Sequence, residues 1–426
     1  MKRNQMTRTI TRAAMGNYSR FIELIIFVLF FQMNGVAQNS ECGTDFIHNT
    51  RMESDAVYKK QVLELELQVE ASIKNHAHNN LKSTIYKIPV VVHVLHLGEA
   101  IGTGTNISDL QIQQAITGLN NRFNNSNGNG VDVEMEFCLA SVDPSGNATT
   151  GINRVNGTSV ANYQTNGITP TGNPCIGGIE TSIKDLSRWP VADYYNIWVV
   201  SEICNGSFVG FASYPVGGLY DGLVIVSTSM TSNSGTLPHE IGHGFFLYHT
   251  FNGDGGNVNC PVDADCTIDG DRVCDTPPHK QNDCGATNPC TVTGVWDNSR
   301  YNYMSYCPLV NRFTQGQKDR IRATAVIAPR ASLLTSVGCG ILGTNEMSST
   351  QEFSVFPNPT QSNFSIINNA QKPLTIVLIS SDGKQLNTLF SQENVVLVDL
   401  SSHPKGLYLL EINDGSKTDF KRIIKE

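Results

Sequence analysis

Three histidines and one glutamate within a single short stretch constrain this chain more than any other feature. His239 and His243 are four residues apart, so a helix would place both on one face, and Glu240 follows the first of them. A continuous helix would carry His249 roughly 9 Å beyond His243, whereas Zn–N bonds are about 2.0–2.1 Å long. The chain must therefore leave the helix between His243 and His249 and turn back.

These side chains predict a catalytic zinc site. Three imidazole ligands leave a fourth coordination position for water, which is typical of catalytic rather than structural zinc. Glu240 is adjacent to a ligand and can reach that water. A site with glutamate as the third ligand is disfavoured, because no Glu occurs between Glu240 and Glu346. Asp254 is a poorer alternative to His249.

The N-terminus is typical of an export signal. Basic residues precede a short apolar run at 24–31, and Gly35 and Ala37 fit a cleavage site, so residues 1–37 are predicted to be a signal peptide. The run is too short for a stable membrane anchor, and no later stretch reaches about 18 uninterrupted apolar residues. We expect no transmembrane anchor in the mature chain.

Composition indicates an extracytoplasmic protein. The 11 cysteines suit an oxidising compartment. Six of them lie between residues 260 and 307 without paired CxxC spacing, which favours disulfides over a second zinc, although their pairing cannot be read from sequence. The net charge is −8, without the excess of Lys and Arg that is typical of nucleic-acid binding, so nucleic acid is not an expected partner.

Residues 85–339 are predicted to form an α/β domain. Segments rich in Val, Ile and aromatic residues predict strands over 88–97, 131–140, 195–202 and 222–228. Helices are predicted over 107–123, 179–188, 236–246 and 314–328. His93, His96 and Trp198 are interpreted as core or edge residues of the strands.

The pattern changes after Cys339. Residues 340–352 have the composition of a linker. Apolar residues then alternate with period two at 353–355, 364–366, 374–378, 397–400 and 408–412, and Asn358-Pro359, Asp382-Gly383 and Asp414-Gly415 mark turns. This pattern predicts a small antiparallel β-sandwich over residues 353–426.

The residues around the histidines resemble a known family. The string HEIGHGFFLYHTF, which begins at His239, is similar to the long zinc signature of the metzincins in their pappalysin (cytophagalysin) branch. Further similar segments are 88–94 (IPVVVHV), 107–120, 137–140 (FCLA), 151–154 (GINR), 269–277, 303–306 (YMSY) and 313–317 (FTQGQ). The resemblance covers roughly residues 85–335 and implies a twisted mixed sheet, a zinc helix and a Met-turn.

The resemblance also implies a function: a zinc metalloendopeptidase acting on proteins or peptides. The three histidines would bind zinc, and Glu240 would be the general base. Tyr306 would stabilise the oxyanion, and Met304 would form the floor beneath the metal. Two alternatives stay open: a catalytically silent binding protein with structural metals, and a zinc amidase or aminopeptidase.

Two departures from the family pattern stand out. Metzincins usually carry Gly three residues after the second zinc histidine, where this chain has Phe246, with a Gly at 244 instead. A left-handed backbone there would strain Phe246 by about 1–2 kcal/mol. The segment between Tyr306 and Phe313 is about two residues shorter than the resemblance leads us to expect. This segment contains no Asp or Glu, so we do not expect this chain to share the preference of some relatives for a basic residue in the S1′ pocket.

Cys42-Gly43-Thr44 resembles the cysteine switch of pappalysin-like propeptides, in which a thiolate occupies the fourth position of zinc. We therefore expect a propeptide over residues 38–84, with a helix over 51–75. The usual upstream arginine is absent, and an ordinary disulfide or an unpaired thiol is the alternative.

Two further expectations concern calcium and export. Asp254, Asp269, Asp271 and Asp275 lie in a Gly- and Asn-rich stretch, and the resemblance makes them candidates for a structural calcium site, with a solvated acidic loop as the alternative. The β-domain, through segments such as 356–360 (FPNPT), resembles the sorting domain of the type IX secretion system. It implies outer-membrane secretion machinery as a partner and a secreted or cell-surface location in a Gram-negative bacterium. A generic adhesive β-domain is the alternative.

Overall fold

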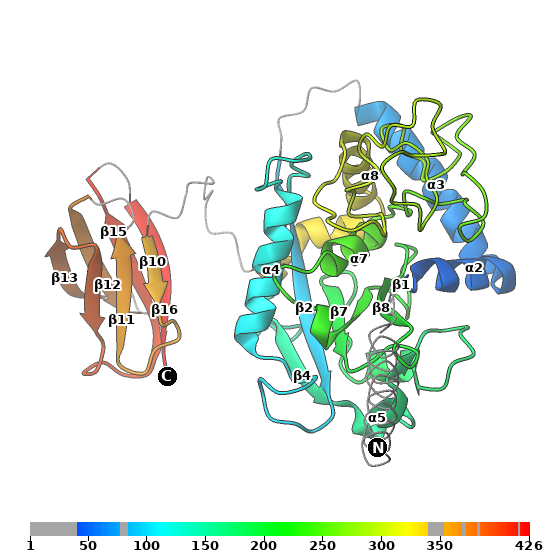
Figure 1. Ribbon diagram of the computed structural model, residues 1–426. Helices are drawn as coiled ribbons and strands as arrows, with labels where there is room; N and C mark the ends of the chain where they lie inside the picture. Colours follow the sequence, from blue (N-terminus) through cyan, green and yellow to red (C-terminus); the bar gives the residue numbers. More distant parts are fainter. Residues whose placement is uncertain (1–40, 77–83, 340–352, 369–371, 381–383, 416–417) are drawn as a thin grey trace, which may run out of the picture. The chain divides into compact units, whose positions relative to one another are not determined.

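The chain divides into two compact units, residues 1–342 and 343–426 (Figure 1). The computed structural model describes residues 41–76, 84–339, 353–368, 372–380, 384–415 and 418–426. The predicted signal peptide, the predicted linker at 340–352 and the predicted turn at Asp382-Gly383 lie outside these residues.

A mixed β-sheet forms the centre of the larger unit (Figure 1). Its strand order is β1-β8-β9-β7-β2-β3, and β4 also pairs with β2. Neighbouring strands are parallel except β8 and β9, which are antiparallel. The strands are β1 (Glu41–Cys42), β2 (Tyr86–His96), β3 (Met135–Leu139), β4 (Ile152–Asn156), β7 (Tyr195–Val200), β8 (Phe208–Ala212) and β9 (Leu223–Val226); β5 (Ile168–Thr169) and β6 (Gly178–Ile179) form a separate short pair. The expected α/β fold with a mixed sheet is confirmed.

The predicted helices are present with somewhat shorter bounds. The α-helices are α2 (Thr44–Ser54), α3 (Ala56–His76), α4 (Asp109–Phe123), α5 (Tyr163–Asn166), α6 (Glu180–Asp185), α7 (Thr236–Gly244) and α8 (Gln315–Ala325). Short 3-10 helices are η1 (Gly157–Ser159), η2 (Ser227–Ser229), η3 (Arg330–Thr335) and η4 (Val337–Cys339). The helix predicted over 51–75 is interrupted at Asp55, whose side chain accepts hydrogen bonds from the backbone N–H groups of Val57 and Tyr58 and so begins α3.

Apolar residues cover both faces of the sheet because successive strand residues point to opposite sides. On one face, Val92 packs in a cluster with Ile116 of α4 and Ile241 of α7. On the other, Trp198 packs in a cluster with Ile183 of α6. His93 is fully buried, and its ring stacks on Trp198 with 5.2 Å between centroids. α7 is thereby held against β8 and β9 in the middle of the unit (Figure 1).

Ten of the 11 cysteines form disulfides. Three bridges connect the six clustered cysteines within the long irregular segment between α7 and α8, as expected from their spacing: Cys260–Cys290, Cys266–Cys274 and Cys284–Cys307. The others are Cys138–Cys339 and Cys175–Cys204. Cys42 is buried and free.

The smaller unit is an antiparallel β-sandwich, as predicted. One sheet has the order β10-β11-β14 and the other β13-β12-β15-β16. The strands are β10 (Phe353–Phe356), β11 (Asn363–Asn368), β12 (Leu374–Ser380), β13 (Gln385–Ser391), β14 (Val395–Asp399), β15 (Gly406–Asn413) and β16 (Thr418–Lys425). Phe364, Leu378 and Leu410 lie in its core. β13 and β16 were not predicted, because both carry largely polar or exposed residues.

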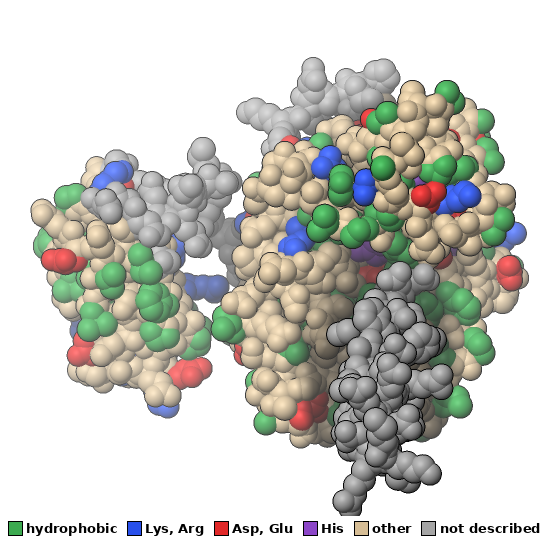
Figure 2. All heavy atoms as spheres, viewed as in Figure 1, with side chains coloured by type: hydrophobic (Ala, Val, Ile, Leu, Met, Phe, Trp, Pro, Cys, Tyr) green, Lys and Arg blue, Asp and Glu red, His purple; other side chains and the backbone are tan. Residues whose placement is uncertain are grey.

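Charge on the face viewed in Figure 2 does not single out a site. Figure 2 shows charged side chains of both signs scattered over the viewed face of the larger unit, with no broad area of one sign among the described residues. None of the helices in the described ranges is both long and apolar enough to cross a membrane.

Candidate metal centre

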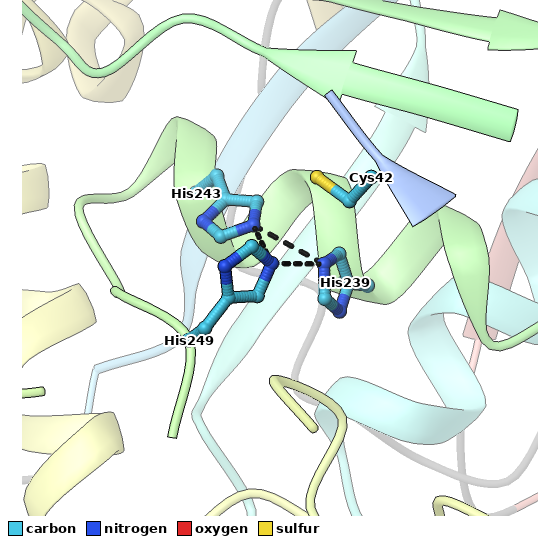
Figure 3. Close-up of side chains that lie close together, drawn as sticks. All are labelled: Cys42, His239, His243 and His249. Atoms are coloured by element: carbon cyan, nitrogen blue, oxygen red, sulfur yellow. Dashed lines mark hydrogen bonds between the residues drawn. The ribbon is translucent and has the colours of Figure 1, made fainter. Parts of the chain in front are cut away.

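The side chains of the three histidines point toward one another (Figure 3). The Nε2 atoms of His239, His243 and His249 lie 3.1 Å from one another in all three pairings. His239 and His243 come from α7, and His249 comes from the segment that follows it. Ligands about 2.05 Å from one tetrahedral ion are about 3.3 Å apart, so the three nitrogens match one shared cation.

The backbone turns back at the end of α7 through a Schellman motif. The N–H of Leu247 donates to the carbonyl of Gly242, and the N–H of Phe246 donates to the carbonyl of His243, both at 2.9 Å. Phe246 has φ +68°, the left-handed conformation. The anticipated strained backbone is therefore present, and it turns the chain so that His249 faces the helix it has just left.

Phe246 is held in this conformation by its surroundings. It is fully buried, with its ring 5.3 Å from that of Tyr214 and the Arg320 guanidinium 4.7 Å above it. Arg320 Nε also donates to the Phe246 carbonyl at 2.7 Å. The nearby Gly244 does not form the bend. It lets the end of α7 pack against Tyr195, because a Cβ at residue 244 would lie 2.0 Å from the Tyr195 hydroxyl.

A turn at residues 303–306 supports the cluster from below. Met304 is fully buried, and a Cβ on Gly242 of α7 would lie 2.5 Å from its sulfur, so only glycine lets the helix pack this closely. The carbonyl of Met304 accepts from the N–H of Thr250 at 3.1 Å. Met304 is thus a packing residue under the helix.

Each imidazole is oriented by a partner at Nδ1. His239 Nδ1 lies 2.7 Å from the Tyr303 carbonyl, and His243 Nδ1 lies 2.8 Å from the Leu247 carbonyl. His249 Nδ1 lies 2.7 Å from Asp45 Oδ2 in α2. Acceptors at Nδ1 place the proton there and leave the Nε2 lone pair for a ligand. Burial lowers the pKa of His239 to about 3, which keeps that ring neutral, as metal binding requires.

Glu240 points into the same centre and is fully buried. Its Oε2 accepts from the Thr44 hydroxyl at 3.4 Å and lies 3.4 Å from Cys42 Sγ, whereas its Oε1 has no hydrogen-bond partner among the described residues. Burial raises the pKa of Glu240 to about 8. An orphaned buried carboxylate oxygen beside three ligand nitrogens fits a centre that holds a cation and a water molecule.

Cys42 is the fourth potential metal ligand of this group. Its sulfur and the three imidazole nitrogens all lie within 4.8 Å of one another, and this is the sole group of three or more potential metal ligands in the described part of the chain. β1 brings Cys42 there by pairing with β8, and the side chain points toward the histidines (Figure 3). Burial, with a further contribution from Glu240, raises the pKa of the thiol well above its usual range.

Tyr306 lies beside the histidines and contacts the backbone of Cys42. Its ring centroid is 4.9 Å from that of His249. Its hydroxyl accepts from the Cys42 N–H at 3.1 Å and donates to the Cys42 carbonyl at 3.3 Å. The β1 segment therefore covers both the histidines and the tyrosine.

The four aspartates considered for calcium do not form one group among the described residues. Asp254 accepts from the N–H groups of Gly256 and Gln281, and Asp275 accepts from that of Gly316. Asp271 accepts from Val273 and Thr276, and Asp269 from Asp265. Each of these carboxylates holds a different turn of the irregular loop, and calcium binding by this stretch stays a prediction.

Sequence reasoning missed Asp45 and both carbonyl partners of the histidines. Tyr303 and Leu247 act through backbone atoms, which carry no residue signature. Asp45 contacts a residue 204 positions away, and nothing in its local sequence indicates that partner.

Comparison with known proteins places both units in families. Residues 179–326 match the peptidase family described as pregnancy-associated plasma protein-A, and residues 354–426 match the secretion system C-terminal sorting domain. A mutant form of promirolysin from Tannerella forsythia aligns with a TM-score of 0.52 and 25% identity, covering 69% of this chain and 97% of that one.

Fungal extracellular metalloproteases are also similar. One from Arthroderma otae is 30% identical over 184 residues, which cover 34% of this chain and 62% of the relative. One from Arthroderma benhamiae is 32% identical over 164 residues, covering 34% of this chain and 52% of the relative. The chain therefore spans between half and two thirds of the length of these relatives.

The larger unit is thus a metzincin, defined by the zinc-type helix, the turn after it and the methionine-bearing loop beneath it. Within that class, residues 179–326 match the pappalysin-type peptidases, and the chain ends in a type IX sorting domain, which marks it as an exported protein. The family resemblance seen in the sequence is confirmed.

Proposed function

We propose that the chain is a secreted zinc-dependent metalloendopeptidase, made in a latent form in which Cys42 blocks the metal centre. The observation that carries this proposal is the convergence of three Nε2 atoms at 3.1 Å beside a fully buried Glu240. A structural metal site has no use for a carboxylate oxygen without a partner, so the orphaned Oε1 favours hydrolysis over binding alone.

Each catalytic step is assigned to a residue of the centre. A zinc ion held by the three imidazoles would polarise the scissile carbonyl and lower the pKa of a water molecule. Glu240 accepts a proton from the attacking water and delivers it to the leaving amine. Tyr306 donates a hydrogen bond to the developing oxyanion once the β1 segment has left its hydroxyl.

Latency follows from the contacts of the 38–84 segment. Cys42 occupies the side of the histidines where water must bind, and Thr44 occupies one oxygen of Glu240. Asp45 orients His249 from the same segment. Release of residues 38–84 would therefore open the metal centre. It would also remove Asp45 from His249, and a water molecule would have to accept the hydrogen bond from His249 Nδ1 instead.

The test compares three full-length proteins on a fluorogenic peptide library and on denatured casein. The wild-type chain should be inactive until its N-terminal segment is removed. Cys42→Ala should show partial cleavage before that step, because β1 without the sulfur leaves the histidines, Glu240 and Tyr306 more readily. Glu240→Gln should bind about one zinc per chain by atomic emission yet lose at least 100-fold in kcat/KM after processing. Mass spectrometry of the products identifies internal cleavage.

Other outcomes would support other functions. Equal digestion by Glu240→Gln and wild type would refute the assigned base. Zinc binding without any cleavage by processed wild type would favour the silent binding protein. Products trimmed only at chain ends would favour an aminopeptidase.

A further inference from the structure

A second cluster of charged side chains lies outside the metal centre. Glu66 of α3 accepts hydrogen bonds at Oε1 from the Tyr248 hydroxyl and from Arg320 Nη2, both at 2.6 Å, and its Oε2 is 3.3 Å from Arg272 Nη1. The side chains of Glu66 and Arg320 are 7% and 3% exposed. We term these three partners, Tyr248, Arg272 and Arg320, the carboxylate site. Together they contact the Glu66 carboxylate from three directions.

Two of these groups are held in place without Glu66. Arg320 Nε donates to the Phe246 carbonyl at 2.7 Å, and its guanidinium lies 4.7 Å and 5.2 Å from the ring centroids of Phe246 and Tyr248. The Tyr248 ring packs against Tyr214, with 5.2 Å between centroids. Because these contacts lie within the part of the chain after residue 84, the site is organised before any carboxylate arrives.

The face around the carboxylate site is apolar. α3 covers it with one stripe of side chains, and the buried residues on the two sides are Tyr58, Val62, Leu65 and Val69 against Tyr214, Phe246, Tyr248 and Ala323. A carboxylate buried in such surroundings costs several kcal/mol unless it is paired and hydrogen-bonded. Glu66 is paired and hydrogen-bonded through its three partners. The carboxylate site is therefore selective for an anion with the shape of a carboxylate.

Removal of α3 leaves the site short of negative charge. Arg272 would then lose its ion pair with Glu66, and Arg320 would keep the buried Asp271 as an acidic neighbour. Asp271 is already engaged by the Thr276 hydroxyl and the Val273 N–H. Two guanidinium groups opposite one carboxylate favour the binding of a further anion.

We propose that the catalytic unit carries a carboxylate-binding site separate from its metal centre, filled by Glu66 in the full chain and open to an acidic side chain of a bound peptide once α3 has been removed. Only this last clause rests on the proposed function. The site lies beside the metal centre, since the ring of Tyr214 contacts both Tyr248 and, at 5.9 Å between centroids, His243. A peptide acid held there would be anchored near the reacting atoms.

The first test is chemical rescue in the full chain. Glu66→Ala empties the site, and 100 mM acetate should raise the folding equilibrium constant of the larger unit about tenfold for a Kd near 10 mM. Chloride at equal ionic strength should not do so. Glu64→Ala is the matched control on the exposed side of α3, where the side chain is 56% exposed, and it should show no acetate effect. Adding Tyr248→Phe to Glu66→Ala should weaken the rescue at least threefold.

The second test uses the processed protein and a labelled peptide of residues 56–76. Glu66→Gln in the peptide should weaken binding at least tenfold by fluorescence anisotropy, and Glu64→Gln should leave it unchanged. Equal rescue of Glu66→Ala by acetate and chloride, or equal binding of the three peptides, would overturn the carboxylate site. Neither test measures cleavage, so loss of the proposed peptidase activity would leave these results standing.

Discussion

Replacement of Phe246 by glycine separates two opposing effects at the turn after α7. Family pattern alone recommends glycine, because φ is +68° here and relief of the left-handed strain is worth about 1–2 kcal/mol. The structure argues the other way. The ring is fully buried against Tyr214, Tyr248 and Arg320, and loss of a buried phenylalanine side chain costs about 3–5 kcal/mol.

We therefore expect Phe246→Gly to be about 2–4 kcal/mol less stable than wild type, since glycine also adds up to about 1 kcal/mol of unfolded-state entropy. Phe246→Ala removes the same ring but keeps the strained Cβ, so it should be less stable than Phe246→Gly. The chain has 3 tryptophans, all in the larger unit, so urea unfolding followed by tryptophan fluorescence reports on that unit.

The order of the three proteins decides the matter. Higher stability of Phe246→Gly than of wild type would show that strain outweighs packing, and the reasoning would be wrong. A glycine variant about 1 kcal/mol less stable than the alanine variant would show that the left-handed backbone carries no appreciable strain, because only the unfolded-state entropy of glycine would then separate the two.

Two further predictions concern buried charges. The Lys184 ammonium lies 2.8 Å from Glu180, with both side chains at most 1% exposed, so Lys184→Met should destabilise the larger unit by about 3–5 kcal/mol in urea unfolding. Adding Glu180→Leu should recover most of that loss, and a double variant as unstable as the single one would contradict the pairing argument. Burial lowers the pKa of His48 from 6.5 to about 4 in the docked 38–84 segment. Between these two values His48 is protonated in the undocked segment but neutral in the docked one, so the docking equilibrium constant falls about thirtyfold by pH 5. The stabilisation is complete above pH 6.5 and disappears as the pH falls toward 4. The loss of docking at low pH is measured as faster labelling of Cys42 by a pyridyl disulfide. If labelling of His48→Phe accelerates equally at low pH, His48 is not the group responsible.

The sandwich and the central sheet show how far local pattern extends. Strands with clear apolar alternation, such as β12 and β15, were predicted because each buries one face. β8 was missed, since its five residues include a central glycine, Gly210, and lack a strong strand signal. Yet β8 pairs with β1 and thereby delivers Cys42 to the histidines.

The acidic loop shows the limit of composition. Asp254 and Asp275 lie close in sequence, but one holds the backbone at Gln281 and the other at Gly316. In a segment without regular periodicity, spacing predicts no relative direction for two side chains. Only the disulfides and turns of the folded loop determine where each carboxylate points.

What the sequence determined by itself was local. The helix repeat makes His239 and His243 neighbours, and the distance constraint forces the return to His249, so the convergence of the three rings follows from eleven consecutive residues. The tertiary structure alone decided the long-range partners: Asp45 for His249 across 204 residues, and Glu66 for Arg320 across 254. Such contacts depend on how separate elements pack, and side chains so far apart in the chain leave no periodic trace of one another.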